Sequence, residues 1–534
     1  MAYLNQLATL PDKNITYLKY KDTYYVIYNY AYKRNANGNP QSKKITIGKL
    51  VDKKSRLFQP NENYLKVYDK PQFIKEEVDC SKIPLSAVKY TRPEGLLQLV
   101  QTIAKELELD VMLRKVFGSD HHYLMSLATY MLCCGNVMKG YERWANKHYL
   151  PTSLCMNDKR ISDIFSQVIT QEKRHQFLDL WSQKASSENF LAYDSTSIST
   201  SSSIIEAKLG FNKENDKTKQ INLGILYGYD SRLPFNYSWY QGNIVDKSYL
   251  KFMLSLTKNL KGKKITFVMD QGYFSSDNLK TIDELGNKFI TFLPRNTNLS
   301  RQSIDEISEL KLGYTDLVPG FKTVKCRTIS SELTGMKCNL HVFLDLDKQI
   351  ELQSDFEEYL QYEEKALQDK IKEKVVTKKT CKYFKIHQEG KTEYSYERDI
   401  EKISYEYNRL GYFVLITNNL DLTSGEVLEA YRGKDLIEKA FCDIKTNLDS
   451  RRLRTQRSET TNGKIFVMFI ALILLSALRN RIRHTEIEYK YSLTNIIEEL
   501  DDIKLFVTDD EKVLHPLTTD QVKILNELNL DIKV

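Results

Sequence analysis

The chain has 534 residues and carries 78 Lys and Arg against 70 Asp and Glu, which gives a formal net charge of +8. Hydrophobic residues make up 41% and charged residues 28%, a balance that is typical of folded proteins and excludes wholesale disorder. With 21 Gly and 11 Pro, collagen-like and low-complexity classes are excluded as well. The length predicts several domains, or one large core with insertions. The charge surplus is a weak indication of a polyanionic partner.

Cysteines, histidines and apolar runs limit the classes of site further. The eight cysteines form no CxxC pair, and the eight histidines form neither an HxxxH nor an HExxH pattern, which argues against a zinc site. No Walker A or GxGxxG sequence occurs, so we expect no nucleotide cofactor. The longest apolar run, 465–478, is shorter than the roughly 20 residues that span a bilayer and predicts a buried core helix. We therefore expect a cytoplasmic protein without a membrane partner.

Residues 1–90 are interpreted as a β-rich, basic domain. Alternate positions from Tyr24 to Tyr32 place tyrosines on one strand face, and the turn-rich stretch 35–40 leads to a second strand around 45–47. Lysines flank this predicted hairpin on both strands. The tyrosine face could contact nucleic acid, or it could be one side of a half-buried sheet with solvated lysines.

After residue 90 the sequence alternates between helical and strand patterns. Helical patterns are expected around 96–107, 124–138 and 161–180, and strands at 190–193, 221–227, 264–269 and 288–293 alternate with helices after them. Strands in a run, followed by strands alternating with helices, predict a mixed sheet flanked by helices. The predicted domains are 1–90, a helical DNA-binding or linker region 91–185, a first core part 186–300, an insertion 301–408 with a charged helix at 356–375, a second core part 409–485, and a C-terminal helical region 486–534.

Two aspartates stand where apolar strands are predicted to end. Asp194 follows the strand at 190–193, and Asp270 follows the strand at 265–269. Carboxylates at strand ends are held at the edge of a sheet, where ligands bind in α/β folds. We expect Gly272 to let the backbone turn sharply beside Asp270. Taken singly, an aspartate at such a position more often caps a helix or a turn.

A third group of polar residues lies on one predicted helix. The capping-box sequence at 423–426 begins this helix, which is expected to end near residue 447. At about 100° per residue, four polar side chains of this helix share one narrow stripe. The stripe could bind a ligand or could be a solvated face of ordinary charge pairs. Its members are Tyr431, Lys434, Glu438 and Lys445.

Together these residues resemble the DDE transposases of bacterial insertion sequences. The series Tyr431-x2-Lys434-x3-Glu438-x6-Lys445 is similar to the Y-R-E-K signature of that family, and Asp194 and Asp270-x-Gly-Tyr are similar to its two earlier acidic motifs. The resemblance covers roughly 160–480 and includes a Gly-Asn-x-x-Asp pattern at 242–246. It implies an α/β fold class, with an RNase H-like mixed sheet flanked by helices and interrupted by a β-rich insertion. It also implies an N-terminal β-rich plus helical DNA-binding region.

Two departures from the family pattern are visible. Lys434 stands where the signature has arginine, so the charge is kept but the bidentate fork that suits phosphate is lost. Some family members stack a flipped base on a tryptophan of the insertion. The three tryptophans of this chain, Trp144, Trp181 and Trp239, all lie outside 301–408, so only a tyrosine or phenylalanine could take that role here.

The resemblance implies metal-dependent DNA cleavage and strand transfer. Two Mg²⁺ ions, for which Mn²⁺ can substitute, would be bound by three carboxylates and would serve phosphoryl transfer. The implied catalytic and metal-binding residues are Asp194, Asp270 and Glu438. The residues implied to contact phosphates are Tyr431, Lys434 and Lys445. Arg451, Arg452 and Arg454, just past the signature, suit phosphate contacts as well, or they form a solvated surface.

The expected partners are double-stranded DNA, as terminal inverted repeats and as target, and a second copy of the chain on that DNA. The expected location is the bacterial cytoplasm, on the nucleoid when DNA is bound. Two alternatives are kept open. A metal-dependent nuclease of the same fold would cleave without joining, and strand-transfer products would distinguish it. A catalytically silent, transposase-derived DNA-binding protein would have no chemical reason to keep all three carboxylates.

Overall fold

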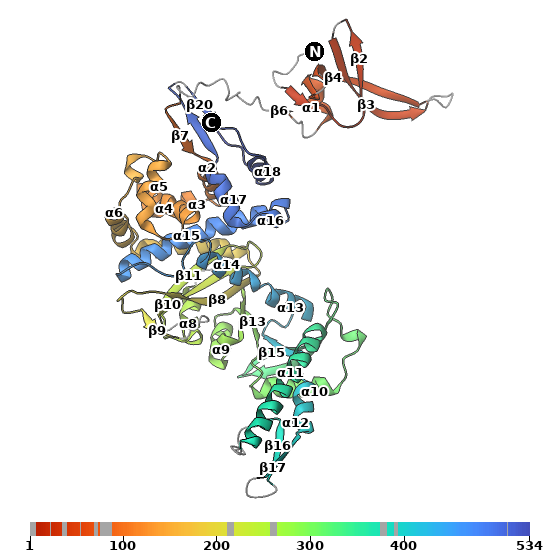
Figure 1. Ribbon diagram of the computed structural model, residues 1–534, viewed down its shortest axis with the longest axis vertical. Coiled ribbons are helices and arrows are strands. Elements are labelled where there is room, and N and C mark those ends of the chain that lie inside the picture. The colour runs from red at the N-terminus through yellow and green to blue at the C-terminus, as the bar shows by residue number, and fades with distance from the viewer. Residues whose placement is uncertain are drawn as a thin grey trace. The chain divides into compact units, whose positions relative to one another are not determined.

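The computed structural model describes residues 7–21, 23–34, 40–53, 55–68, 73–74, 88–210, 218–256, 264–373, 382–388, 393–509 and 511–534. The chain forms two compact units (Figure 1). The first unit consists of Met1–Gly95, Asp502–Val522 and Asp531–Val534. The second consists of Leu96–Asp501 and Lys523–Leu530.

The first unit contains the antiparallel sheet that the tyrosine pattern predicts. β3 pairs with β4, which confirms the hairpin, although its turn at 35–39 lies outside the described residues. Alternation along β3 sends Val26 into a core that also holds Ile47, Phe58 and Tyr64, all nearly inaccessible to solvent. The described strands follow the order β2-β3-β4-β5-β1-β6. Their bounds are β1 Leu7–Thr9, β2 Ile15–Tyr20, β3 Thr23–Arg34, β4 Pro40–Asp52, β5 Leu57–Pro60 and β6 Phe73–Ile74, with α1 at Glu62–Val67.

Residues 486–534 differ from the expected all-helical region. They contain the helices α16 (Glu486–Lys490), α17 (Leu493–Asp501) and α18 (Thr519–Glu527), but also the strands β19 (Lys504–Val507) and β20 (Lys512–Leu514). β19 pairs with β20 and with β7 (Tyr90–Pro93), about 400 residues earlier in the chain. A partner so distant leaves no signal in the local sequence, and therefore the strands were not predicted.

The second unit begins with short helices, as predicted for 91–185. The expected helix at 161–180 is interrupted by a π-helical turn at Ile164–Val168, and α7 restarts behind Thr170, whose side chain accepts the Lys173 backbone N–H. Gly463 packs against this turn so closely that a Cβ there would lie 2.2 Å from the Phe165 carbonyl oxygen. The helices are α2 Gly95–Glu106, α3 Leu109–Phe117, α4 His121–Cys134, α5 Tyr141–Lys147, α6 Asp158–Asp163 and α7 Gln171–Ser182.

A mixed sheet forms the centre of the second unit and confirms the predicted fold class. Among the described residues it has nine strands, in the order β11-β10-β8-β12-β13-β18-β15-β14, with β9 beside β10. β8, β12 and β13 run parallel, and the other pairings are antiparallel. The strands are β8 Phe190–Ser199, β9 Lys208–Leu209, β10 Lys219–Gly228, β11 Pro234–Gln241, β12 Thr266–Met269, β13 Lys288–Phe292, β14 Val324–Leu333, β15 Met336–Asp345 and β18 Tyr412–Thr417.

Helices flank this sheet. α14 packs on β8 and β10, and α15 packs on β11. Figure 1 shows α14 and α15 on one side of these strands and α8 and α9 on the other. The bounds are α8 Asp246–Leu256, α9 Ser276–Glu284, α10 Asn298–Glu309, α13 Ser424–Arg432, α14 Asp435–Lys445 and α15 Ser458–Ile482.

The segment 301–408 is joined to the core more closely than the sequence suggests. β14 and β15 extend the central sheet, because Leu340 of β15 pairs with Ile416 of β18. The charged helix α11 spans Leu346–Lys372, ten residues longer at its start than expected, since Asp345 caps it by accepting the Lys348 backbone N–H. The remaining elements, β16 Phe384–Gln388, β17 Tyr394–Arg398 and α12 Ile400–Tyr407, share a small separate core with α11.

α15 is the apolar helix predicted from the run at 465–478. Of the described helices it is the one that is long and apolar enough to cross a membrane by length and composition, but 78% of its apolar window is buried inside the second unit. Apolar residues surround the whole helix axis, which is typical of a helix enclosed by protein. The prediction of a buried core helix is confirmed.

Candidate active site

Asp194 lies inside a strand and not at its end as predicted. β8 continues to Ser199 because β10 pairs with it along its whole length, with Asp194 opposite Ile225. The Asp194 Oδ1 atom accepts the Ser195 backbone N–H at 2.8 Å. The Tyr273 hydroxyl lies 3.5 Å from the same oxygen and donates to the Ser195 Oγ at 2.8 Å. Tyr273 belongs to the second acidic motif, but no role was predicted for it.

Asp270 follows the last residue of β12, as predicted. Met269 pairs with Tyr193 in the parallel β8–β12 ladder, so Asp270 and Asp194 follow paired residues on neighbouring strands. Asp270 also caps the short helix at 271–273 by accepting the Gln271 backbone N–H at 2.8 Å. The expectation for Gly272 is wrong, because its backbone is not left-handed and an added Cβ would meet nothing within 4 Å.

The predicted helix from 423 to 447 is two helices. Its capping box is confirmed, with Thr423 and Glu426 bonded reciprocally at the start of α13. A tighter turn follows α13. In this turn the Lys434 backbone N–H donates to the Tyr431 carbonyl, three residues earlier, and not to the carbonyl four residues earlier as in an α-helix. The Tyr229 ring occupies the space beside this turn, so a Cβ at Gly433 would lie 1.8 Å from a ring carbon. The single continuous stripe predicted from 100° per residue is therefore wrong.

Two of the four signature residues, Tyr431 and Lys434, nevertheless contact Asp270, and Glu438 is linked to it through Lys434. Tyr431 donates its hydroxyl to Asp270 Oδ1 at 3.2 Å. The Lys434 Nζ lies 3.3 Å from Asp270 Oδ2 and 3.4 Å from Glu438 Oε1. The Lys434 side chain is only 9% exposed, whereas the Glu438 side chain is 54% exposed. Lys434 therefore combines a contact across the fold, with Asp270, and a charge pair with Glu438 one turn along its own helix.

The electrostatics of Tyr431 connect all three predicted carboxylates. Burial raises the pKa of the Tyr431 hydroxyl far above its ordinary value, and the negative charges of Asp270, Glu438 and Asp194 raise this pKa further. A hydroxyl that stays protonated can only donate to the neighbouring carboxylate. Tyr431 is therefore a fixed donor that orients Asp270.

The donor set suits a divalent cation. Carboxylate oxygens are the ligands that Mg²⁺ and Mn²⁺ prefer. The Lys434 ammonium already places a positive charge between Asp270 and Glu438, where it stands in for such an ion. Within the described ranges, no three His, Cys, Asp or Glu residues are grouped closely enough to hold a metal.

The basic residues after Glu438 that were predicted to contact phosphates lie apart from the contacts around Asp270. Lys445 is the last residue of α14, about 10 Å along the helix axis from Glu438. Arg451 and Arg452 are exposed, and their backbone runs beside the end of β8, where the Arg451 carbonyl accepts the Ser199 backbone N–H. The Arg454 guanidinium is engaged within the protein, with Asp449 at 3.0 Å and the Asn136 side-chain carbonyl at 3.1 Å.

Residues 185–474, more than half of the chain, match the family model of the transposase DDE domain, and this range contains every residue of the site. The chain belongs to the DDE transposases. It is also similar to a solved piggyBac transposase in a synaptic complex with hairpin DNA, with a TM-score of 0.35, 9% sequence identity and 76% of each chain covered. No curated protein matches the chain.

As a member of this family, the protein is a DNA transposase that depends on divalent metal. The family match covers the residues of the core sheet and the signature helices. The contacts at Asp270 show how the side chains of these residues are arranged in space. The coarse functional prediction is thereby confirmed.

A buried polar cluster that was not predicted lies beneath residues 451–454 of the transposase. Asn136 donates its amide to the carbonyls of Asp449 and Arg452, at 2.9 and 3.1 Å. Lys464, on α15, donates to the Asn136 side-chain carbonyl at 3.2 Å. Burial lowers the pKa of Lys464 to about 7, and the nearby Arg454 charge lowers it as well. A single lysine at the start of a long apolar helix is the sequence signal that could have indicated it.

Replacing Lys464 by Met is expected to flatten the dependence of transposase stability on pH between 7 and 10. The folded protein loses the Lys464 proton near pH 7, whereas an unfolded lysine keeps it to about pH 10.4. The free energy of unfolding should therefore rise with pH in this window, by up to about 1.4 kcal/mol per unit. Urea unfolding at pH 7, 8 and 9 measures the difference between the two proteins. Equal slopes for wild type and Lys464→Met would contradict it.

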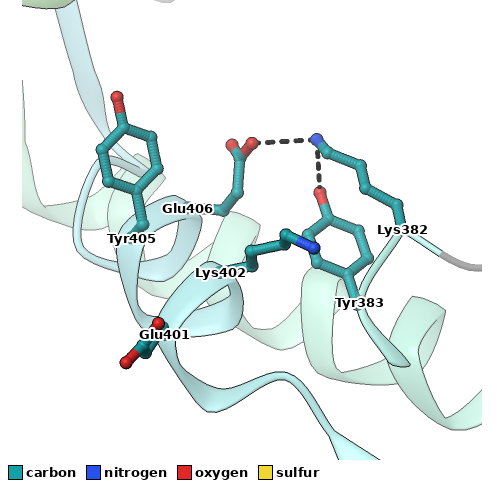
Figure 2. A pocket seen from close by; sticks show the side chains of 6 residues that line it. All are labelled: Lys382, Tyr383, Glu401, Lys402, Tyr405 and Glu406. Carbon is teal, nitrogen blue, oxygen red and sulfur yellow. Dashed lines mark hydrogen bonds and ion pairs between the residues drawn. The ribbon is translucent and has the colours of Figure 1, made fainter. Parts of the chain in front are cut away.

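The described residues of the second unit include the walls of two hollows. One, of about 450 Å³, lies directly beside Asp270 and is lined by Gln271, Gly272, Phe274, Ser275, Ser276, Pro294, Asn296 and Thr297. Because a Cβ added at Gly272 would meet no atom within 4 Å, this wall of the hollow is open to a ligand. The other, of about 250 Å³, is formed by α12 and the residues before β16 (Figure 2). There Lys382 bonds Glu406 at 2.8 Å and Tyr383 at 2.9 Å, and none of the lining residues belongs to the predicted site.

Proposed function

We propose that this transposase cleaves DNA at the ends of its own mobile element and joins the released 3′ ends to target DNA. Asp194, Asp270 and Glu438 are proposed as the metal-binding carboxylates. The observation that supports this most directly is the buried Lys434 ammonium between Asp270 and Glu438. The parallel register of β8 and β12 supports Asp194 as the third member.

Two Mg²⁺ ions, or Mn²⁺ in their place, are the proposed cofactors. When bound, such ions activate the attacking oxygen and stabilise the leaving oxygen of an in-line phosphoryl displacement. The protein's own contribution is orientation. Tyr431 and the Gln271 backbone N–H both donate to Asp270 Oδ1, which turns Oδ2 toward Lys434 and Glu438. The Ser195 backbone N–H holds Asp194 in the same way.

We propose that Tyr431, Lys434, Lys445, Arg451, Arg452 and Arg454 contact the phosphate backbone of the DNA. Lys434 carries a compact charge on a flexible stem, so it can leave the two carboxylates and move to a phosphate when metal binds. Arg451 and Arg452 are exposed beside the end of the strand that carries Asp194. Arg454 would have to exchange its contact with Asp449 for a phosphate.

The proposed partners are the terminal inverted repeats, the target DNA and a second copy of the transposase. Two element ends must be cut and joined, which a homodimer on DNA would accomplish with one site for each end. The proposed location is the bacterial cytoplasm, on the nucleoid. The open hollow beside Asp270 offers room for a nucleotide next to the proposed metal site.

A labelled duplex that carries the terminal repeat, incubated with a supercoiled target plasmid and Mg²⁺, tests this proposal. The wild type is expected to produce a 3′-OH cut at the repeat boundary and labelled plasmid as the product of joining, whereas Asp194→Asn should produce neither. Cutting without labelled plasmid would favour the nuclease alternative. Binding without any cut would favour a silent DNA-binding protein.

A further inference from the structure

The connection between α14 and α15, residues 446–457, presents exposed arginines on a backbone that is held from within. Ser450 is 0% exposed and Leu453 is 2% exposed, whereas Arg451 and Arg452 between them are exposed. The buried residues anchor the segment, and the arginines lie on its outer side. We name residues 446–457 the arginine connection.

The end of β8 holds one side of the arginine connection. The Ser199 backbone N–H donates to the Arg451 carbonyl at 3.1 Å, and the Leu453 backbone N–H donates to the Ser199 carbonyl at 3.0 Å. The Thr200 hydroxyl donates to the Leu453 carbonyl at 3.2 Å. Because β8 also carries Asp194, these bonds tie the arginine connection to a strand of the proposed metal site.

A single side chain from the helical region, Asn136, holds the arginine connection from another side. It lies two residues after α4 and is only 1% exposed. Its amide donates to the carbonyls of Asp449 and Arg452, at 2.9 and 3.1 Å. Its side-chain carbonyl accepts a bond from the Arg454 Nη1 atom at 3.1 Å. Buried backbone carbonyls need such donors, and in an irregular segment side chains supply them.

The backbone before Asn136 is shaped to allow this contact. Gly135 has a left-handed conformation, with φ at 73°, and it lies directly against the arginine connection. A Cβ at Gly135 would lie 2.7 Å from the Asp449 Cβ atom. The turn that ends α4 and the arginine connection are therefore packed as one unit.

We propose that Asn136 is a positioning residue for DNA binding, which holds the arginine connection so that Arg451 and Arg452 meet the phosphate backbone. Ordering a segment when DNA binds costs conformational entropy. A connection that is ordered beforehand retains more of the binding free energy of its arginines. The inference rests on the phosphate contacts proposed for these two arginines, but not on the assignment of the metal-binding carboxylates.

A double-mutant cycle in the full chain tests the inference. The affinity for a labelled duplex is measured by fluorescence anisotropy in EDTA, at several salt concentrations, for Asn136→Leu, for Arg451→Gln/Arg452→Gln and for the triple variant. The arginine variant should lose about tenfold in affinity at about 100 mM salt, and its slope of log K against log salt should be shallower by about 2, because each phosphate contact contributes about 0.9. Asn136→Leu should lose about threefold or more.

The triple variant carries the decision. It should bind within about twofold of the arginine variant, because a residue that acts only through the arginines has no further effect once they are gone. An undiminished further loss in the triple variant would overturn the inference. If Asn136→Leu does not fold, Asn136→Asp takes its place. The carboxylate removes the donors to the two backbone carbonyls but keeps an acceptor for Arg454.

The matched control is Asn418→Leu, which removes another buried side-chain amide, just after β18. Asn418 accepts the Phe289 backbone N–H at 2.9 Å and donates to the Asn287 carbonyl at 3.3 Å. After correction for the folded fraction by circular dichroism, it should bind DNA as the wild type does. Equal losses in Asn136→Leu and Asn418→Leu would overturn the inference, because they would show only a general loss of stability.

The same measurements distinguish failure of the inference from failure of the proposed function. Wild-type affinity of Asn136→Leu beside a weakened arginine variant would overturn the inference alone. Wild-type affinity of the arginine variant would overturn both the proposed phosphate contacts of Arg451 and Arg452 and the inference. Because binding is measured without metal, failure of the proposed carboxylates would appear only in the cleavage assay.

Discussion

Replacing Glu438 by Gln is expected to lower the rate of DNA cleavage by at least about 10³-fold and to leave the transposase folded. The amide keeps the size of the side chain but removes the negative charge that faces the Lys434 ammonium, 3.4 Å away. A metal ligand of this kind supports several kcal/mol of transition-state stabilisation, and each 1.4 kcal/mol corresponds to a factor of ten in rate. Because Glu438 is half exposed, its ion pair should contribute less than about 1 kcal/mol to stability.

Single-turnover cleavage of a labelled terminal-repeat duplex in Mg²⁺ and in Mn²⁺ measures this effect, with the melting temperature recorded beside it. The matched control is Asp435→Asn, one turn earlier on α14, where an exposed carboxylate makes no contact with Asp270 or Lys434 in the described structure. It should cleave within a few-fold of the wild type. A Glu438→Gln variant that cleaves as fast as Asp435→Asn would show that Glu438 does not belong to the metal site.

Replacing Arg479 by Ala is expected to lower the free energy of unfolding by about 3 kcal/mol, the lower end of the range of about 3–5 kcal/mol for breaking a buried ion pair. Asp443, on α14, has a side chain that is 3% exposed and accepts bonds from the Arg479 Nε and Nη2 atoms at 3.1 and 2.5 Å. Without the guanidinium, the Asn447 amide at 2.7 Å would be the remaining side-chain donor that the structure shows for this carboxylate. A buried charge that loses its counter-charge is strongly destabilising. Partial exposure of Arg479 reduces the effect.

Urea unfolding of the full chain measures this destabilisation. The control Lys280→Ala removes an exposed pair with Glu284 on α9, and we expect it to cost no more than about 0.5 kcal/mol. The double variant Asp443→Leu/Arg479→Leu should recover much of the loss, since apolar residues can replace a buried pair without an unpaired charge. A loss for Arg479→Ala no larger than that of Lys280→Ala would contradict the interpretation.

The ion pair between Arg479 and Asp443 also connects the signature helix α14 to the core. Asp443 and Glu438 both lie on α14, and Arg479 lies on α15, so this ion pair fixes the helix that carries Glu438 to the long core helix. Tyr229, in the connection between β10 and β11, packs against Gly433 in the turn between α13 and α14.

The sequence by itself determined the features whose causes are local. The capping box at Thr423, the apolar helix α15, the β3–β4 hairpin and the aspartate directly after β12 were all predicted, because caps, periodicity and strand ends depend on neighbouring residues. The family resemblance also depended on residue types at short spacings, as in the series from Tyr431 to Lys445. Such spacings can be recognised in the sequence without knowing the fold.

Only the tertiary structure decided what depends on distant partners. β10 pairs with β8 past Asp194, Ile416 of β18 pairs with β15 and brings it into the core sheet, and Tyr229 packs against Gly433 where the signature helix is interrupted. Lys434 was predicted as one of four residues on a narrow stripe of one helix, whereas in the structure its buried side chain contacts Asp270, 164 positions earlier in the chain. The pairing of strands, the burial of side chains and the compensation of charges depend on residues far apart in the chain. For that reason no local sequence pattern predicted them.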